Sequence, residues 1–297
     1  MHHKFGGNWT VKKLGRLEGY LTAYMKIFTE NEGARFFTTN YIDAFAGTGY
    51  RAESGDPSHG PDTLFDDDDL CEVASYGQGS AQIALEIPKP FDKYTFIEKD
   101  PDRASALENL KQEYPKRAGS IEIITGDANE ELQTICQETN WSRNRAVAFL
   151  DPYGMQVEWS TLEAIANTQA IDMWLLFPLG QAINRLLTRN KIPEGALAER
   201  LTEAFGTEEW REAFYRPNLE QSLFSSGDQH VMKDTDFEGI AGFFLKRLGS
   251  IFHSVAPNHY LLRNSKNVPL YLLCFAAGNP RGTPTAIRIA NYLLKQG

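Results

Sequence analysis

The sequence predicts an α/β fold in which a mostly parallel central sheet carries helices on both faces. Short apolar runs alternate with segments of helical periodicity, an order that is typical of parallel sheets. Each of the first four apolar runs ends at or beside an acidic residue, and 42% of the 297 residues are apolar, enough for a sizeable core. We expect one domain over residues 1–297, with a loop insertion at about 51–79 and a helical insertion at about 181–236.

The amino-terminal segment is predicted to be a helix from about Val11 to Glu30, because apolar residues recur there at helical spacing. Lys12, Lys13 and Arg16 cluster near its start. A solvated face is the simpler interpretation of this cluster, and contact with a ligand or with nucleic acid is the alternative.

The chain is organised around the segment YIDAFAGTGY, residues 41–50, which predicts an apolar strand ending on Asp43 and a turn on Gly47-Thr48-Gly49. Both glycines can adopt positive φ and let a ligand approach the backbone, and Asp43 can accept hydrogen bonds. A plain tight turn is the alternative. The third glycine of the dinucleotide fingerprint is missing, so we do not expect a pyrophosphate site.

The polar insertion at 51–79 is long enough to be a lid or binding loop over the ligand. Its four consecutive aspartates, Asp66 to Asp69, favour a solvated tip over a cation site, because adjacent side chains do not readily converge on one ion. No metal is therefore expected. Ser80 is predicted to cap a helix over residues 81–86.

Three further strands are predicted to end in acidic residues. Residues 91–98 end on Glu98, residues 121–124 precede Asp127, and residues 146–150 precede Asp151. Helices are predicted between them, one opened by Lys99-Asp100-Pro101 and continuing to about residue 114, the other at 130–138. A carboxylate at the end of the second strand is placed to accept both hydroxyls of a ribose. Asp127 either contacts an adenine amino group or caps the following helix, and the two roles are compatible.

The remaining chain is predicted to add a helix at 161–167 and a fifth strand at 171–177. Residues 181–215 have a helical pattern, residues 215–236 are polar and irregular, and a helix follows at 240–252. Strands at 260–262 and 270–276 and a helix at 287–295 complete the fold.

Asp151, Pro152 and Tyr153 form a motif that suits chemistry on an amino group. The exocyclic amine of a nucleobase is a weak nucleophile, and hydrogen bonds to Asp151 and to the Pro152 carbonyl would localise its lone pair. Tyr153 could stack on the base, which contributes ~1 to 3 kcal/mol at comparable sites. A plain β-turn is the alternative, although the other acidic strand ends favour chemistry.

These motifs resemble those of class I S-adenosylmethionine-dependent methyltransferases. IDAFAGTG at 42–49, FIEKD at 96–100 and GDA at 126–128 are similar to their first three motifs, and FLDPYG at 149–154 resembles the fourth motif of amino methyltransferases that act on nucleic acids, with one proline fewer. The arrangement as a whole is similar to the three-Cys-motif partner protein (TcmP) family, whose name refers to a companion protein with three cysteines.

The resemblance implies a Rossmann-like fold, S-adenosyl-L-methionine as cofactor and direct transfer of a methyl group without a metal. The cofactor-binding residues that it implies are Asp43, Phe45, Ala46, Gly47, Thr48 and Gly49 for the amino-acid end, Glu98 for the ribose, and Asp127 and Ala128 for the adenine. Lys99, next to Glu98, is also expected to bind the cofactor. The catalytic residues that it implies are Asp151, Pro152 and Tyr153.

Composition restricts the partners. The net charge of −9 and the pI near 5.3 disfavour non-specific binding of nucleic acid, although a local basic face remains compatible with them. Cys71, Cys136 and Cys274 have no metal-binding spacing, and no signal sequence or membrane span is apparent, so we expect a cytoplasmic protein.

The leading hypothesis is methylation of an amino group of an RNA or DNA base. One alternative is a methyltransferase-fold binding or regulatory partner of a three-cysteine-motif protein without catalysis of its own. The other is methylation of a small molecule or a protein.

Overall fold

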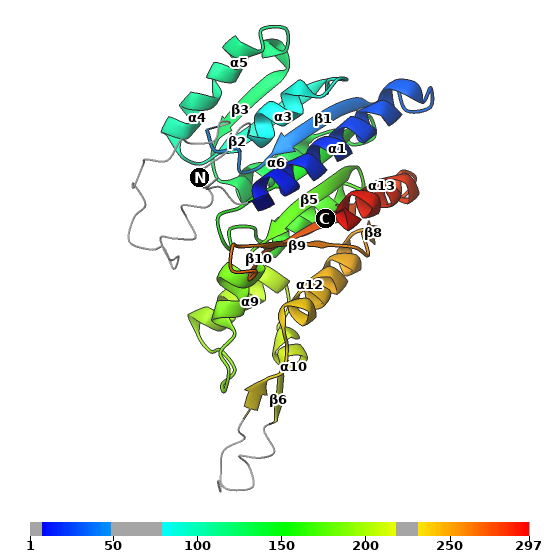
Figure 1. The fold of residues 1–297 in the computed structure, drawn as a ribbon. Coiled ribbons are helices and arrows are strands. Elements are labelled where there is room, and N and C mark those ends of the chain that lie inside the picture. Colours follow the sequence, from blue (N-terminus) through cyan, green and yellow to red (C-terminus); the bar gives the residue numbers. More distant parts are fainter. Residues whose placement is uncertain (1–7, 49–78, 218–230, 297) are drawn as a thin grey trace, which may run out of the picture.

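The computed structural model of the chain describes residues 8–48, 79–217 and 231–296. Its centre is an eight-stranded sheet in the order β3-β2-β1-β4-β5-β10-β8, with β9 also paired to β10 (Figure 1). The strands of this sheet are β1 (Thr38–Asp43), β2 (Lys93–Glu98), β3 (Ile121–Thr125), β4 (Asn144–Leu150), β5 (Ile171–Phe177), β8 (Ser254–Val255), β9 (Tyr260–Arg263) and β10 (Pro269–Ala277). The first five strands pair in parallel, and β10 runs antiparallel to β5.

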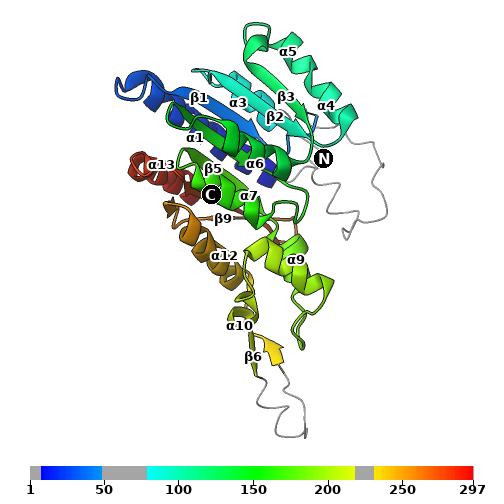
Figure 2. The ribbon, with the colours of Figure 1, turned by 180° about the vertical axis from the view of Figure 1, so that it is seen from behind.

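Helices cover both faces of the sheet, as Figures 1 and 2 show from opposite sides. They are α1 (Asn8–Glu30), α3 (Ser80–Glu86), α4 (Pro101–Leu107), α5 (Asn109–Glu113), α6 (Ala128–Glu138), α7 (Trp159–Asn167), α8 (Asn184–Leu186), α9 (Ala196–Phe205), α10 (Trp210–Phe214), α12 (Phe237–Ile251) and α13 (Thr283–Lys295). Two short turns are also helical, η1 (Ala118–Ser120) and the π-helical η2 (Leu179–Ile183). The predicted α/β architecture is therefore confirmed.

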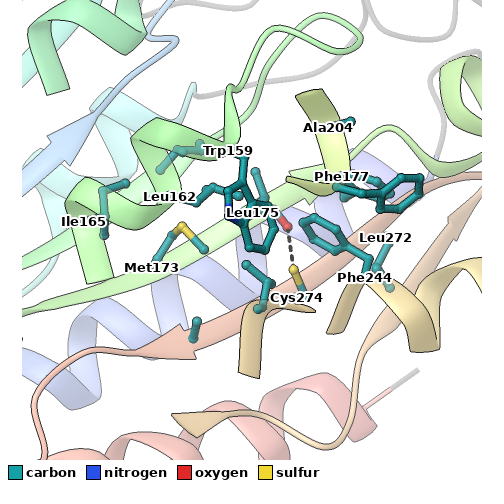
Figure 3. Packing of buried hydrophobic residues seen from close by; sticks show 14 of the residues in the cluster. Trp159, Leu162, Ile165, Met173, Leu175, Phe177, Ala204, Phe244, Leu272 and Cys274 are labelled. Carbon is teal, nitrogen blue, oxygen red and sulfur yellow. Dashed lines mark hydrogen bonds between the residues drawn. The ribbon is translucent and has the colours of Figure 1, made fainter. Parts of the chain in front are cut away.

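Side chains that alternate along the strands divide the core into two clusters. Tyr41 lies in the cluster under α1, α3 and α13, whereas the next residue, Ile42, lies in the cluster under α6, α7 and α12. In the second cluster, the rings of Phe177 and Phe244 stack with their centroids 3.7 Å apart (Figure 3). Cys274 is buried beside them, and burial raises the pKa of its thiol (Figure 3).

The helical insertion after β5 packs on the sheet through the second cluster, which includes Leu201, Phe205 and Trp210. The prediction that residues 215–236 are irregular is wrong in part. They contain the antiparallel strands β6 (Tyr215–Pro217) and β7 (Val231–Lys233), which lie at one end of the molecule (Figure 1). These strands are too short for an alternating pattern to identify them.

Other boundaries also differ. The predicted helix that opens at Lys99-Asp100-Pro101 and continues to about residue 114 starts at Pro101, as expected, but is broken at Glu108 into α4 and α5. Ser80 does not cap α3 but is its first helical residue, and Gly79 occupies the cap position. The predicted loop over residues 51–79, its aspartates and Cys71 lie almost wholly outside the described residues.

No helix in the described ranges combines the length and the apolar character needed to cross a membrane. Among the same residues, no group of three or more His, Cys, Asp or Glu side chains is arranged to hold a metal ion.

Gly206 ends α9 in the left-handed conformation, with φ of 64°, and a Cβ atom there would lie 2.2 Å from Cγ of Trp159. We expect Gly206→Ala to lower the free energy of unfolding by at least about 1 to 2 kcal/mol, measured by urea denaturation. Gly249→Ala is the matched control, because a Cβ at this position in the last turn of α12 meets no atom of the described residues within 4 Å. It should raise stability by roughly 0.5 to 1 kcal/mol. Equal effects at the two positions would contradict this interpretation.

Candidate active site

Four carboxylates lie along one edge of the sheet, at the carboxyl ends of neighbouring strands. In the order β3, β2, β1 and β4 they are Asp127, Glu98, Asp43 and Asp151. Backbone hydrogen bonds connect the segments that follow these strands: Ala44 N–H to Phe149 O at 3.1 Å, Ala46 N–H to Ile97 O at 3.0 Å and Gly126 N–H to Glu98 O at 3.1 Å. The structure thus brings the acidic residues selected from the sequence to one edge, while their roles remain predictions.

Asp43 is fully buried at the end of β1, and its Oδ2 accepts a hydrogen bond from the Tyr41 hydroxyl at 3.3 Å. Its Oδ1 makes no hydrogen bond within the described residues. Burial is the main cause that raises the pKa of Asp43 to about 7; Asp151 raises it further, and hydrogen bonds from Ser80 and the Phe45 backbone oppose the rise. A buried carboxylate oxygen without a partner is suited to accept a hydrogen bond from a ligand.

The turn after Asp43 leaves room at its backbone. Gly47 has φ of 61°, and a Cβ atom at this position would meet no atom of the described residues within 4 Å. Positive φ and open space are the two conditions under which glycine permits close approach of a ligand. Phe45, Ala46 and Thr48 lie in the same turn, and Gly49 lies outside the described residues.

Glu98 and Asp127 each keep part of their hydrogen-bonding capacity. Oε1 of Glu98 accepts the N–H of Asp100 at 2.9 Å, and its Oε2 makes no hydrogen bond within the described ranges. Asp127 caps α6 by accepting the N–H of Asn129 at 2.9 Å, and its Oδ2 accepts a hydrogen bond from Lys99 at 3.2 Å. Burial acts to raise the pKa of Asp127, but the hydrogen bonds from Asn129 and Lys99 lower it overall. The predicted capping role is confirmed, and Ala128 is the first residue of α6.

Asp151 forms an ion pair through Oδ2 with the ammonium group of Lys13 on α1. Lys13 and Arg16 are each only 6% exposed, so the interpretation of this cluster as a solvated face is wrong for both residues. The side chain of Asp151 is 28% exposed, and its Oδ1 makes no hydrogen bond within the described residues. The ion pair therefore orients the carboxylate while one oxygen remains available as an acceptor.

The segment that follows Asp151 is held by side-chain hydrogen bonds. Nδ2 of Asn129 donates to the carbonyl of Gln156 at 2.8 Å, and Oε1 of Gln156 accepts the N–H of Tyr153 at 2.8 Å. Pro152 is buried, whereas Tyr153 is 51% exposed. An exposed ring on an anchored backbone is suited to stacking against a planar ligand.

Sequence reasoning selected neither Lys13 nor Asn129 as a site residue. Asn129 also accepts hydrogen bonds from the N–H of Glu158 at 3.0 Å and the hydroxyl of Thr161 at 2.9 Å, and so joins α6 to the start of α7. For Lys13, the sequence does contain a signal: it is one of several basic residues clustered on the helix that precedes the first strand. Nothing local distinguishes Asn129 from an ordinary polar residue in the first turn of a helix.

No family model matches the chain, and a search of curated proteins finds no match. Among solved structures, the chain is similar to protein LPL1258 from Legionella pneumophila, of family DUF519, with 13% identity, a TM-score of 0.50, and coverage of 98% of this chain and 92% of that one. Two further matches have lower TM-scores. One is Trm1 from Pyrococcus horikoshii in complex with S-adenosyl-L-methionine, with 10% identity, a TM-score of 0.40, and coverage of 93% of this chain and 58% of that one. A third match is an S-adenosylmethionine-dependent methyltransferase from Clostridium acetobutylicum, with 9% identity, a TM-score of 0.37, and coverage of 88% of this chain and 91% of that one. The chain thus has a Rossmann-like α/β fold with a mostly parallel central sheet, as the sequence predicts.

The ion pair between Lys13 and Asp151 should appear as a coupling in a double-mutant cycle. We expect Lys13→Met and Asp151→Asn each to lower the free energy of unfolding by about 1 to 3 kcal/mol, because each removes a charged partner from a largely buried side chain. The double substitution should lower the free energy of unfolding by clearly less than the sum of the two single effects. The difference, which is the coupling energy, should be at least about 0.5 kcal/mol in urea denaturation. Lys99→Met is the control, because the pair of Lys99 and Asp127 is solvent-exposed and its loss should cost less than about 1 kcal/mol. Additive effects of Lys13→Met and Asp151→Asn would refute the coupling.

Asp43 should make stability depend on pH. Its pKa in the folded protein, about 7, lies above the ordinary value of 3.8, so its contribution to stability is complete below 3.8 and is lost as the pH rises towards 7. Asp43→Asn cannot lose a proton. We therefore expect this variant to gain stability relative to the wild type between about pH 5 and about pH 8, by up to about 3 kcal/mol in urea denaturation. A pH-independent difference would show that Asp43 titrates normally.

Proposed function

We propose that the chain is an S-adenosylmethionine-dependent methyltransferase that acts on an exocyclic amino group of a nucleic-acid base. One observation carries this proposal: the row of carboxylates at the ends of β3, β2 and β1 adjoins the Asp151-Pro152-Tyr153 segment that follows β4. The row suits a nucleoside with an attached cationic group, and the segment beside it suits an amine.

S-adenosylmethionine has three groups of donors that this row could accept: an ammonium group, two ribose hydroxyls and an adenine amino group. The unpaired Oδ1 of buried Asp43 suits the ammonium group, and Oε2 of Glu98 suits the ribose. Asp127 and the first turn of α6 lie next along the edge, where the adenine would follow. Lys99 and the turn from Phe45 to Gly49 complete the proposed cofactor-binding residues. Bound there, S-adenosylmethionine supplies a methyl group on a positively charged sulfur, which leaves as a neutral thioether.

Asp151 and Pro152 would then orient the acceptor. An amino group that donates one hydrogen bond to Oδ1 of Asp151 and one to the Pro152 carbonyl is held with its lone pair directed away from both oxygens. Lys13 contributes by fixing the other oxygen of Asp151. The new nitrogen–carbon bond leaves one excess proton on nitrogen, which passes to Asp151 or to water. Alignment of the reactants is the main contribution expected of the protein.

Tyr153 would hold the base. A base removed from its stack needs a planar surface to replace the lost stacking energy, and the half-exposed ring of Tyr153 beside Asp151 provides one. A side chain whose role was to complete the core would be buried, as Phe96 near the end of β2 and Phe149 near the end of β4 are.

The second candidate is a methyltransferase-fold partner of a three-cysteine-motif protein, which would bind the cofactor without catalysing transfer. The resemblance of its motifs to the TcmP family favours it. Methylation of a small molecule or a protein uses the same cofactor site with a different acceptor.

Titration calorimetry with S-adenosylmethionine, followed by transfer of a labelled methyl group to total RNA, DNA or protein, separates these functions. We expect binding by the wild type and label in nucleic acid. Asp151→Ala should lower transfer at least ~100-fold, because it removes an acceptor that orients the amine, and should retain cofactor binding. Glu98→Gln, a change in the proposed ribose site, should instead weaken cofactor binding.

Binding without transfer to any acceptor would favour the partner function, and label in protein alone would favour protein methylation. Wild-type protein that binds no S-adenosylmethionine would refute the proposal.

A further inference from the structure

Arg16, Lys12 and Tyr260 form a compact group, here called the α1–β9 cluster, where α1 passes β9. The guanidinium carbon of Arg16 lies 3.7 Å from the centroid of the Tyr260 ring, and the Lys12 ammonium lies 5.8 Å from it. Nη1 of Arg16 donates to the Lys12 carbonyl at 2.8 Å. The two cations thus share one aromatic ring, an arrangement that fixes the guanidinium plane.

The positive charge of this cluster is not neutralised within the described part of the chain. Arg16 is 6% exposed, and its Nε and Nη2 are buried without a hydrogen-bond partner. No ion pair joins Arg16 or Lys12 to a carboxylate among the described residues, and the nearby Asp151 is already paired with Lys13. A buried cation with unsatisfied donors lowers the stability of the folded protein, because it has lost its hydration. An anion with two acceptor oxygens would replace the lost hydrogen bonds.

Tyr260 shows the same excess of positive charge. Burial acts to raise the pKa of its hydroxyl, but Lys12 and Arg16 together lower it below the ordinary value. The phenol is therefore held in an environment that favours negative charge. An anion that displaces part of this interaction would be stabilised by the same two cations.

The α1–β9 cluster lies on the acceptor side of Asp151. Lys13, which pairs with Asp151, and Arg16 are three residues apart and so share one face of α1. Tyr260 is on β9, which reaches the sheet through β10, beyond β5, whereas the proposed cofactor carboxylates are on β1, β2 and β3, on the other side of β4. An anion bound at Arg16 is consequently separated from the cofactor by the residue that orients the amine.

The positive surface continues along the same edge. Arg263 ends β9, and Lys266 lies in the turn to β10, both exposed. Since Leu272 of β10 pairs with Phe177 at the end of β5, this turn lies at the carboxyl edge of the sheet. Further cations beyond Tyr260 suit a ligand with more than one phosphate.

We propose that Arg16, Lys12 and the Tyr260 hydroxyl bind a phosphate of a single nucleic-acid strand whose base is presented to Asp151. This inference rests on the proposed function and names its substrate as a strand with a phosphodiester backbone. A guanidinium binds two phosphate oxygens through parallel N–H donors, and Nε and Nη2 of Arg16 are such a pair. A local site of this kind is compatible with the acidic net charge, because it needs only a few phosphate contacts.

The test measures the affinity for short fluorescein-labelled single strands of RNA and of DNA by fluorescence anisotropy, at several salt concentrations and without cofactor. We expect Arg16→Met to weaken binding of the preferred strand about tenfold or more, because a charge-assisted hydrogen bond is lost. The slope of log affinity against log salt should fall by about 1. Lys116→Met is the matched control, an exposed lysine before β3 at the opposite edge of the sheet, and should not change the affinity.

Because Arg16 is buried, Lys12→Met repeats the test at a half-exposed side chain, and circular dichroism checks that each variant is folded. Affinity equal to that of the wild type in folded Arg16→Met and Lys12→Met overturns the phosphate site. So does a wild type that binds neither strand. Competition by adenosine monophosphate as strong as that by the unlabelled strand also overturns the proposal, because the ligand is then a free nucleotide.

Calorimetry with S-adenosylmethionine on the same samples distinguishes the two proposals. Variants that lose affinity for the strand, in a protein that binds no S-adenosylmethionine, support the phosphate site and refute the methyltransferase function. Cofactor binding and methyl transfer with unchanged affinity for the strand overturn the phosphate site alone.

Discussion

Parallel pairing of β3, β2, β1 and β4 is the constraint on which the candidate site depends. Parallel strands all end at the same edge of a sheet, so the pairing alone brings acidic residues from distant parts of the chain together there. The hydrogen bonds from Ala44, Ala46 and Gly126 extend this pairing just past the strand ends. An antiparallel arrangement of the same strands would place neighbouring carboxylates at opposite edges.

The arrangement has an energetic cost at Asp43. A carboxylate that is fully buried, with one oxygen unpaired among the described residues and Asp151 nearby, destabilises the folded protein at neutral pH. Such a residue is retained more readily when a ligand removes the cost. Arg16 is a comparable case with the opposite charge, because it is buried and two of its donors, Nε and Nη2, have no hydrogen-bond partner among the described residues. These two residues are the basis on which we propose a cationic ligand group on one side of Asp151 and an anionic group on the other.

Much of the fold was predictable because strand and helix patterns are local. The predicted limits of β5, residues 171–177, agree with the structure, since this run is apolar except for Asp172 and Pro178 follows it directly. β8 has only two residues and was not predicted, because such a strand depends on the neighbouring edge of β10 and not on its own pattern. Asp127 was correctly placed as a helix cap, whereas Ser80, which also precedes a helical pattern, is inside α3 and contacts Asp43 instead.

The sequence by itself determined the α/β class and the placement of carboxylates at strand ends, because both follow from residue periodicity and from the polar residues that end apolar runs. Only the tertiary structure decided that Lys13 pairs with Asp151, 138 residues away, and that Arg16 is buried against Tyr260. A helix pattern shows which residues share a face. Which cation on that face becomes buried depends on the sheet and loops that pack against it, and these are brought together only when the whole chain folds.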